Sequence, residues 1–96
     1  MKMARSSGNV FEDLGLNRQT AENLRIRAEL MTELRELIRR RRLTQVQAAK
    51  LFGVTQPRVS DLVRGKISLF TIDMLVNILA KARRRVLVRT TAARAA

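Results

Sequence analysis

The stretch that decides the fold runs over residues 43–65 and reads LTQVQAAKLFGVTQPRVSDLVRG. Thr44 is a helix-capping residue, and the glutamine three positions later completes a capping box. Gly53 allows the positive φ that a sharp turn between helices demands. Thr55 caps a second helix, and Pro57 lies in its first turn, where a missing N–H costs little. The stretch therefore predicts two short helices joined by a tight turn.

The apolar residues of this stretch have the spacing that two steeply crossing helices need. Ala49 precedes Gly53 by four positions, Val59 follows it by six, and Leu62 comes three later. We expect a small residue at the crossing, Ala49, and branched aliphatic residues opposite it. The spacing predicts a helix-turn-helix, and an ordinary antiparallel helix pair is the alternative. The remaining residues expected to face inward are Val46, Leu51 and Val63.

Length and charge indicate one small, strongly basic domain. The chain has 96 residues, 20 Lys and Arg against 8 Asp and Glu, and a net charge of +12. A hydrophobic content of 46% is too high for a wholly disordered polycation. Such a charge favours a nucleic-acid or anionic-membrane partner, with a solubilising surface as the alternative. Because the only aromatic residues are three Phe, duplex DNA is a better candidate than single strands, whose bases stack on exposed rings.

The composition also excludes several chemistries. The chain has no Cys and no His, so disulfides, zinc fingers, thiol nucleophiles and imidazole bases are excluded. We expect no cofactor, no metal and no enzymatic activity, because the acidic residues lie mostly on one helix face beside Arg. No apolar run approaches the ~20 residues that span a bilayer, and no apolar region follows the first basic residues. We therefore expect a cytoplasmic protein associated with the bacterial nucleoid.

The residues before the central stretch predict an arm, a docked turn and a long helix. Residues 1–7 are expected to form a mobile arm, and an apolar cluster around Gly15 a turn docked on the domain. Asn17 is a helix cap, and apolar residues recur at helical spacing over residues 18–41. Cations in the run 39–42 are favoured at a helix end, and the same run can clamp phosphates. The cluster consists of Val10, Phe11, Leu14 and Leu16.

The residues after the central stretch predict one more helix and a strand. Residues 68–82 have a helical apolar face that includes Leu69 and Val76, whereas residues 85–90 are β-branched and extended in character. A single strand has unpaired edges, so we expect it to pair with its copy in a second subunit. Alternatively, residues 84–90 continue the helix or pair with the N-terminal segment. The dimerisation residues would be Val86, Leu87 and Val88.

These elements predict an all-α fold, a compact bundle of four to five helices with a short C-terminal β-strand. We divide it into an N-terminal arm and docked turn (1–17), a helix-turn-helix domain (18–82), and a C-terminal strand and tail (83–96), of which residues 91–96 are expected to be frayed. Pairing of the strands across a homodimer would place two helices about 34 Å apart, which matches a palindromic DNA site.

The central stretch resembles the helix-turn-helix of the XRE and phage-repressor family over about residues 32–80. The resemblance lies in the opening Leu-Thr-Gln-x-x-x-Ala, the central Gly-Val-Thr-Gln, and the closing Val-Ser-x-Leu-x-x-Gly. The flanks GNVFEDLGL (residues 8–16) and RVLVR (residues 85–89) look like the HigA-type antitoxin subgroup of that family. That resemblance implies a partner toxin of the RelE/ParE type and repression of the pair's own operon.

The second helix of the motif is expected to read base edges in the major groove, N-terminal end first. Gln56 can pair with adenine in a bidentate manner, Arg58 suits guanine, and Pro57 offers only apolar contact. The family resemblance favours Gln56 as the strongest reader. A solvated helix face is the alternative, and Asp61 can instead pair locally with an arginine. The candidate base-reading residues are Gln56, Pro57, Arg58, Ser60, Asp61 and Arg64.

Phosphate contacts are expected from the edges of the motif, where helix N-terminal amides and cations lie. The candidates are Thr44, Gln45, Lys66, Arg41 and Arg42. The sequence therefore predicts a transcriptional repressor that binds specific sequences of double-stranded DNA. The alternative is a nonspecific architectural protein of the nucleoid, which explains the charge but needs no polar readers on one helix.

Overall fold

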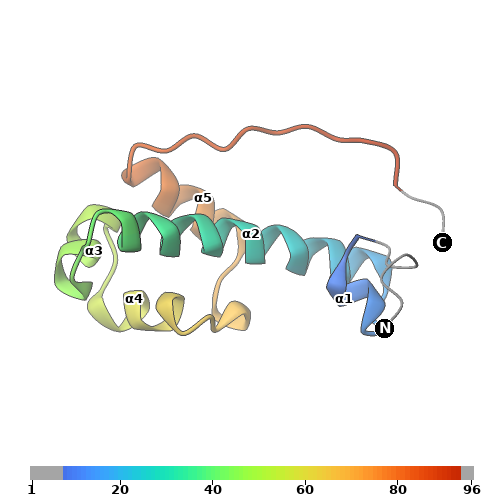
Figure 1. Cartoon of the computed structure of the whole chain (residues 1–96), viewed down its shortest axis with the longest axis horizontal. Coiled ribbons are helices and arrows are strands. Elements are labelled where there is room, and N and C mark those ends of the chain that lie inside the picture. The colour runs from blue at the N-terminus through green and yellow to red at the C-terminus, as the bar shows by residue number, and fades with distance from the viewer. Residues whose placement is uncertain (1–7, 94–96) are drawn as a thin grey trace.

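The computed structural model describes residues 8–93, which contain five α-helices and one 3-10 turn (Figure 1). The all-α prediction is therefore confirmed for this range. The predicted arm (residues 1–7) and the last three residues of the predicted tail lie outside it. The elements are α1 (Val10–Asp13), α2 (Arg18–Arg40), α3 (Gln45–Phe52), α4 (Gln56–Val63), η1 (Ile67–Leu69) and α5 (Ile72–Lys81).

The long helix α2 organises the molecule, whose extents are 43 × 27 × 22 Å. Figure 1 shows α2 along the long axis, α1 at one end, and α3 and α4 at the other. Helix α2 contacts α1, α4, η1 and α5, and α3 contacts α4 and α5. The position of every other helix is thus set directly or through one neighbour by α2.

Each of the four longer helices begins with a side chain that caps its first turn. The Asn17 carboxamide accepts a hydrogen bond from a backbone N–H of α2, and Thr55 and Thr71 do the same for α4 and α5. The predicted capping box is confirmed: Gln47 N donates to Thr44 Oγ1 at 3.1 Å, and Thr44 N donates to Gln47 Oε1 at 2.9 Å. Each such cap contributes about 0.5–2 kcal/mol, so the helix starts are fixed locally.

The helix ends use a left-handed residue, but this residue is not always glycine. Gly53, with φ of +69°, ends α3 as predicted, and Lys81 Cε lies 3.1 Å from where a β-carbon would stand. Arg42 follows α2 with φ of +53°, and Arg83 follows α5 with φ of +64°. A left-handed conformation costs a non-glycine residue roughly 1–2 kcal/mol. Because Arg42 adopts it, the right-handed helix cannot continue, and α2 ends at Arg40, one residue before the predicted bound.

The core is formed where α2, α3, α4 and α5 meet around two phenylalanines. Phe52 and Phe70 are each 1% exposed. The predicted burial of Val59 and Leu62 is confirmed, because both belong to the same buried cluster. The other large side chains that are fully buried there are Met31, Leu34 and Leu75.

The most buried position of α3 lies one residue earlier than predicted. Ala48 is completely buried, whereas Ala49 is half-buried and packs against the core, as Leu51 does. Helix α3 turns Ala48 and Phe52, four residues apart, toward the core, so Val46 lies on the outer side and is half exposed. Leu51 is half-buried, and Val63, expected inside, is 41% exposed.

The N-terminal apolar cluster is less well covered than predicted. Residues 10–13 form the short helix α1, which Asn9 caps with its side chain. Phe11 is half-buried, whereas Val10, Leu14 and Leu16 are exposed. Helix α1 contacts α2 but is only four residues long, and Leu14 and Leu16 lie beyond its end. It therefore cannot bury all four apolar side chains.

The predicted helix 68–82 is interrupted, because Phe70 and Thr71 are extended between η1 and α5. This break allows the Phe70 side chain to enter the core. Helix α5 keeps the predicted apolar face at Leu75 and Leu79, while Leu69 and Val76 are exposed.

The predicted C-terminal strand is absent from the described residues, and 84–93 form neither helix nor strand. A strand exists only through hydrogen bonds to a neighbouring strand, and this single chain provides none within residues 8–93. Figure 1 shows the segment running back along the long axis toward the α1 end. Val86 packs partly against the core, whereas Leu87 and Val88 are 88% and 85% exposed.

The burial of Ala48 in α3 gives a direct stability test. We expect Ala48→Leu to lower the free energy of unfolding by about 1–3 kcal/mol, because a fully buried site has no room for three more carbons. Ala49→Leu is the matched control and should cost clearly less. Urea unfolding of both variants measures the difference, and equal losses would contradict the observed register.

Candidate nucleic-acid interface

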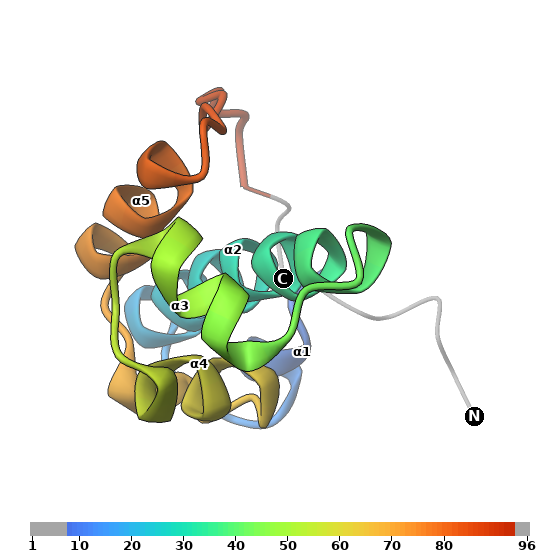
Figure 2. The same cartoon turned by 90° about the vertical axis from the view of Figure 1, so that its left-hand side faces the viewer.

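Helices α3 and α4 form the predicted helix-turn-helix at one end of the molecule. Figure 2 looks onto this end, where α3 and α4 cross and α4 lies at the periphery. The turn between them closes when Val54 N donates to Ala49 O at 3.1 Å. Helix α4 packs on α3 and α2 and has few contacts with α5. Its inner side is therefore anchored, while its outer side is open.

The face of α4 that points outward is polar. Val59 and Leu62 are buried on its inner side. Gln56, Pro57 and Arg64 are exposed, whereas the other three predicted base-reading residues are half-buried. The half-buried ones are Arg58, Ser60 and Asp61.

Gln56 is the predicted reader that the fold leaves most available. It is the first residue of α4 and is exposed. Its side chain makes no hydrogen bond within residues 8–93, so both the carboxamide oxygen and nitrogen can meet a ligand. A glutamine can use these two groups together on the edge of an adenine.

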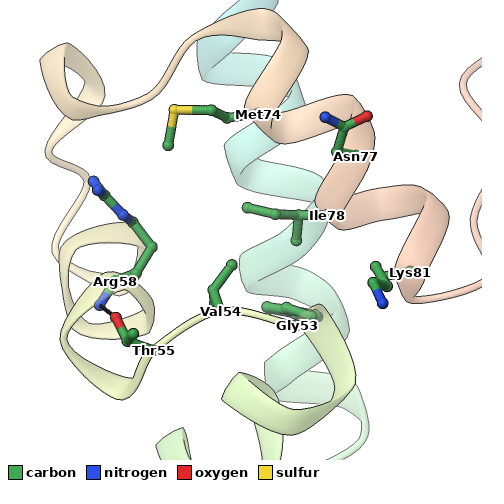
Figure 3. Close-up of a pocket in the computed structure, with 9 residues that line it drawn as sticks. Gly53, Val54, Thr55, Arg58, Met74, Asn77, Ile78 and Lys81 are labelled. Atoms are coloured by element: carbon green, nitrogen blue, oxygen red, sulfur yellow. Dashed lines mark hydrogen bonds between the residues drawn. The ribbon is translucent and has the colours of Figure 1, made fainter.

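Arg58, in contrast, is folded back against its own chain. Its Nη1 donates to Leu69 O at 3.2 Å, and its guanidinium lies 5.4 Å from the centre of the Phe70 ring. The Asp61 carboxylate is 4.0 Å away, so the local pairing considered for Asp61 is present, although at the limit of an ion pair. Figure 3 shows the Arg58 side chain leaving α4 toward the segment that precedes α5.

A groove of about 410 Å³ separates the first turn of α4 from α5. Arg58 lies at one side of it and Lys81 at the other (Figure 3). Its lining is mostly apolar, with Phe52, Val54, Met74 and Ile78 among its residues. This groove separates α4 from α5. On this side, α4 is therefore fixed by the contacts of Arg58 with Leu69 and Phe70.

The predicted phosphate-binding residues lie around the motif. Thr44 and Gln45 are at the start of α3, and the Thr44 hydroxyl is used by the capping box. Lys66 follows α4, and Arg41 and Arg42 follow α2; all three are exposed.

Sequence reasoning missed several cations near the two turns. Arg35 of α2 reaches the turn after α4, where its Nη1 lies 3.0 Å from the position of a Gly65 β-carbon. Lys81 lies similarly over Gly53. Arg27 donates to Ile67 O and Phe70 O. No local signal could identify these contacts, because each joins residues far apart in the sequence.

Charge is distributed unevenly along the molecule. Residues 41–66 carry six cationic side chains and one acidic side chain, whereas six of the eight acidic residues lie in residues 12–36. Many of the latter are paired, including Glu22 with Arg25 and Glu36 with Arg39. Hydrogen bonds from these arginines hold the pKa of Glu22 and the pKa of Glu36 below the usual range of a glutamate. Residues 41–66, around the helix-turn-helix, thus carry an excess of positive charge. Residues 81–93 carry a second one, with five cationic side chains and no acidic side chain.

Residues 8–93 contain no group of three or more acidic side chains arranged to hold a metal ion. None of their helices combines the length and the hydropathy needed to cross a membrane.

Comparison with known proteins agrees with this geometry. A family model described as a helix-turn-helix domain matches residues 10–91. A solved structure assigned to the XRE family of transcriptional regulators is 32% identical, covers 80% of this chain and 90% of its own, and superposes with a TM-score of 0.70. The chain belongs to the XRE family of helix-turn-helix proteins. No curated protein matches it.

Family membership explains why the match extends beyond the motif. In this XRE-family chain the matched range begins at α1 and runs past α5 into the C-terminal segment. The long helix α2 and the end of α5 are thus part of the family's common structure, and α3 and α4 are held by them.

In this XRE-family protein, a substitution at the left-handed Arg42 should change the free energy of unfolding and the affinity for DNA in opposite directions. We expect Arg42→Gly to raise the free energy of unfolding by about 0.5–1 kcal/mol, because relief of the positive φ exceeds the entropy that glycine adds to the unfolded chain. If Arg42 contacts phosphate, affinity for any duplex should fall in the same variant, with about one fewer ion released. Arg42→Lys is the control that keeps the charge.

The two measurements are urea unfolding and duplex binding at several salt concentrations. A more stable variant with unchanged affinity and salt dependence would remove Arg42 from the predicted phosphate contacts.

Proposed function

We propose that this protein is a transcriptional regulator, a repressor, that binds specific sequences of double-stranded DNA with α4 in the major groove. Membership of the XRE family supports the coarser part, a DNA-binding regulator. The observation that carries the finer part is the exposed polar face of α4. At its first turn the Gln56 side chain makes no hydrogen bond to any residue of the described range. Helix α4 is the recognition helix of this proposal.

In this proposal the roles of the two groups of residues differ. Side chains of the recognition helix read bases, with Gln56 the principal reader and Pro57 offering an apolar contact to a thymine methyl. Ser60, Asp61 and Arg64 extend the same face. The residues around the motif set affinity and register through phosphates. These are Thr44, Gln45, Lys66, Arg41 and Arg42.

We further propose that the protein acts as a homodimer joined by its C-terminal segments. Leu87 and Val88 are almost fully exposed, and residues 84–93 form no strand within the described chain. Pairing of Val86, Leu87 and Val88 with a second copy would cover these side chains and satisfy the backbone. A two-fold dimer would present two recognition helices to a palindromic operator about one helical turn apart.

The resemblance of residues 8–16 and 85–89 to HigA-type antitoxins supports a narrower role. In that role the protein also neutralises a toxin of the RelE/ParE type and represses the operon that encodes both. The cheapest test is the adjacent gene: a small basic reading frame whose product co-purifies with this chain would support it. Such a regulator would work in the cytoplasm, on nucleoid DNA.

A nonspecific architectural protein is the second candidate, because the net charge of +12 alone would bind any duplex. Selection of bound duplexes from a random pool identifies an operator, and a gel shift with competitor DNA then gives the specificity ratio. We expect a ratio of ~10³ or more for the operator. A ratio near one would favour the architectural role.

Two substitutions should separate base reading from phosphate contact. We expect Gln56→Ala to cost ~1–3 kcal/mol on the operator and little on random duplex, since it removes hydrogen bonds to a base edge. Lys66→Ala should weaken binding to both duplexes alike and lower the salt slope by about one. Titrations of both variants on both duplexes measure this. An equal loss on both duplexes for Gln56→Ala would contradict base reading.

The dimer proposal has its own test. We expect Leu87→Asp, and deletion of residues 84–96, to give a monomer by light scattering, because each removes the apolar contact between copies. Val76→Asp is the matched control on an exposed position of α5. A dimer that survives the deletion would place the interface elsewhere.

A further inference from the structure

The turn after the recognition helix is held by arginines from two different helices. Arg27 of α2 donates from Nη1 to Ile67 O at 3.3 Å and to Phe70 O at 3.2 Å. Arg58 of α4 donates from Nη1 to Leu69 O at 3.2 Å. Three carbonyl groups of residues 67–70 therefore accept hydrogen bonds from guanidinium groups.

Both arginines are themselves fixed. Arg27 also donates from Nε to Asn23 Oδ1 at 2.7 Å. The Arg58 guanidinium lies over the Phe70 ring and near the Asp61 carboxylate. Phe70 is 1% exposed, so the ring under Arg58 is part of the core and not a mobile surface group. Hydrogen bonds from a charged donor and a cation over an aromatic face each stabilise this arrangement.

We infer that Arg58 is a positioning residue, which sets the orientation of the recognition helix, and not a reader of bases. Arg58 joins the first turn of α4 to residues 67–70, and Arg27 joins the same residues to α2. The groove beside α5 leaves that side of α4 without other support. The two arginines thus fix the angle at which the reading face of α4 leaves the body of the protein.

The contacts that Arg58 makes within the protein favour this role over base contact. To reach a base, Arg58 would have to leave the Leu69 carbonyl and the Phe70 ring, which would lose its hydrogen-bond donor and its cation. The Gln56 side chain has no hydrogen bond to break within residues 8–93. Reading is therefore assigned to Gln56 and positioning to Arg58. This inference rests on the proposed function of α4.

A first experiment needs no DNA. The amides of Leu69 and Phe70 donate to Lys66 O and Ile67 O within the turn, so their hydrogen exchange reports its opening. We expect Arg58→Met and Arg27→Met to exchange these amides about tenfold faster or more, the effect of losing a charged hydrogen bond. Arg64→Met, which removes an exposed cation from the end of the same helix, is the matched control and should leave them unchanged.

Arg58→Lys provides the conservative rescue. A lysine can still place a cation over the ring and offer one donor, so we expect it to restore most of the protection. Urea unfolding of each variant checks that the chain remains folded. Unchanged exchange in Arg58→Met would overturn the inference.

A second experiment selects bound duplexes from a random pool for the wild type and for each variant. Positioning predicts that sequence preference weakens at every base pair that α4 reads, for Arg58→Met and also for Arg27→Met, although Arg27 lies on α2. Relaxation at a single base pair in Arg58→Met, with no effect of Arg27→Met, would show that Arg58 reads a base and would overturn the inference.

The two experiments fail separately. If the wild type selects no sequence, the proposed function is wrong, and the exchange rates alone then decide whether Arg58 and Arg27 hold the turn. If the wild type selects an operator but exchange and preference are unchanged in Arg58→Met, the proposed function stands and the positioning role fails.

Discussion

Burial of one side of α4 is the constraint on which the rest of the structure depends. Val59 and Leu62 are removed from water together with Ala48 and Phe52 of α3, and this burial leaves the helix only one rotational setting. In that setting Gln56, at the first turn, and Arg64, just after the last turn, must face outward. The polar face is thus a consequence of apolar packing, and any function of α4 depends on the fit between α3 and α4.

Rotation about its own axis is not the only freedom of a short helix. An eight-residue helix that packs along one side can still tilt, and tilt would move its first turn relative to the body. The 67–70 turn removes this freedom, because Arg27 and Arg58 bind its carbonyl groups from α2 and α4. Apolar packing and guanidinium hydrogen bonds therefore fix two different degrees of freedom of the same helix.

The sequence allowed the motif to be predicted because its signals are local. Caps such as Thr44 and Thr55 and the turn at Gly53 act within four residues, and the structure confirms each. The fold-back of Arg58 could not be predicted, since its partners lie 11 and 12 positions later and meet it only after folding. Ala48 and Ala49 are chemically alike, so only the packing of α3 could decide between them. The strand predicted over residues 85–90 is absent for a different reason: a strand requires a hydrogen-bonded partner strand, and residues 8–93 of a single chain provide none.

Charge is distributed unevenly over the molecule. A net charge of +12 spread evenly would repel itself in all directions and attract DNA to every face. Here the acidic residues are concentrated in residues 12–36 and several are paired with arginines there, so the field is weakened at the end that carries α1. The cations of residues 41–66 remain largely unbalanced at the other end, and those of residues 81–93 are not balanced by any acidic residue of that segment. A polyanion would therefore be attracted to the end that carries α3 and α4, where Gln56 is exposed, and also to the C-terminal segment.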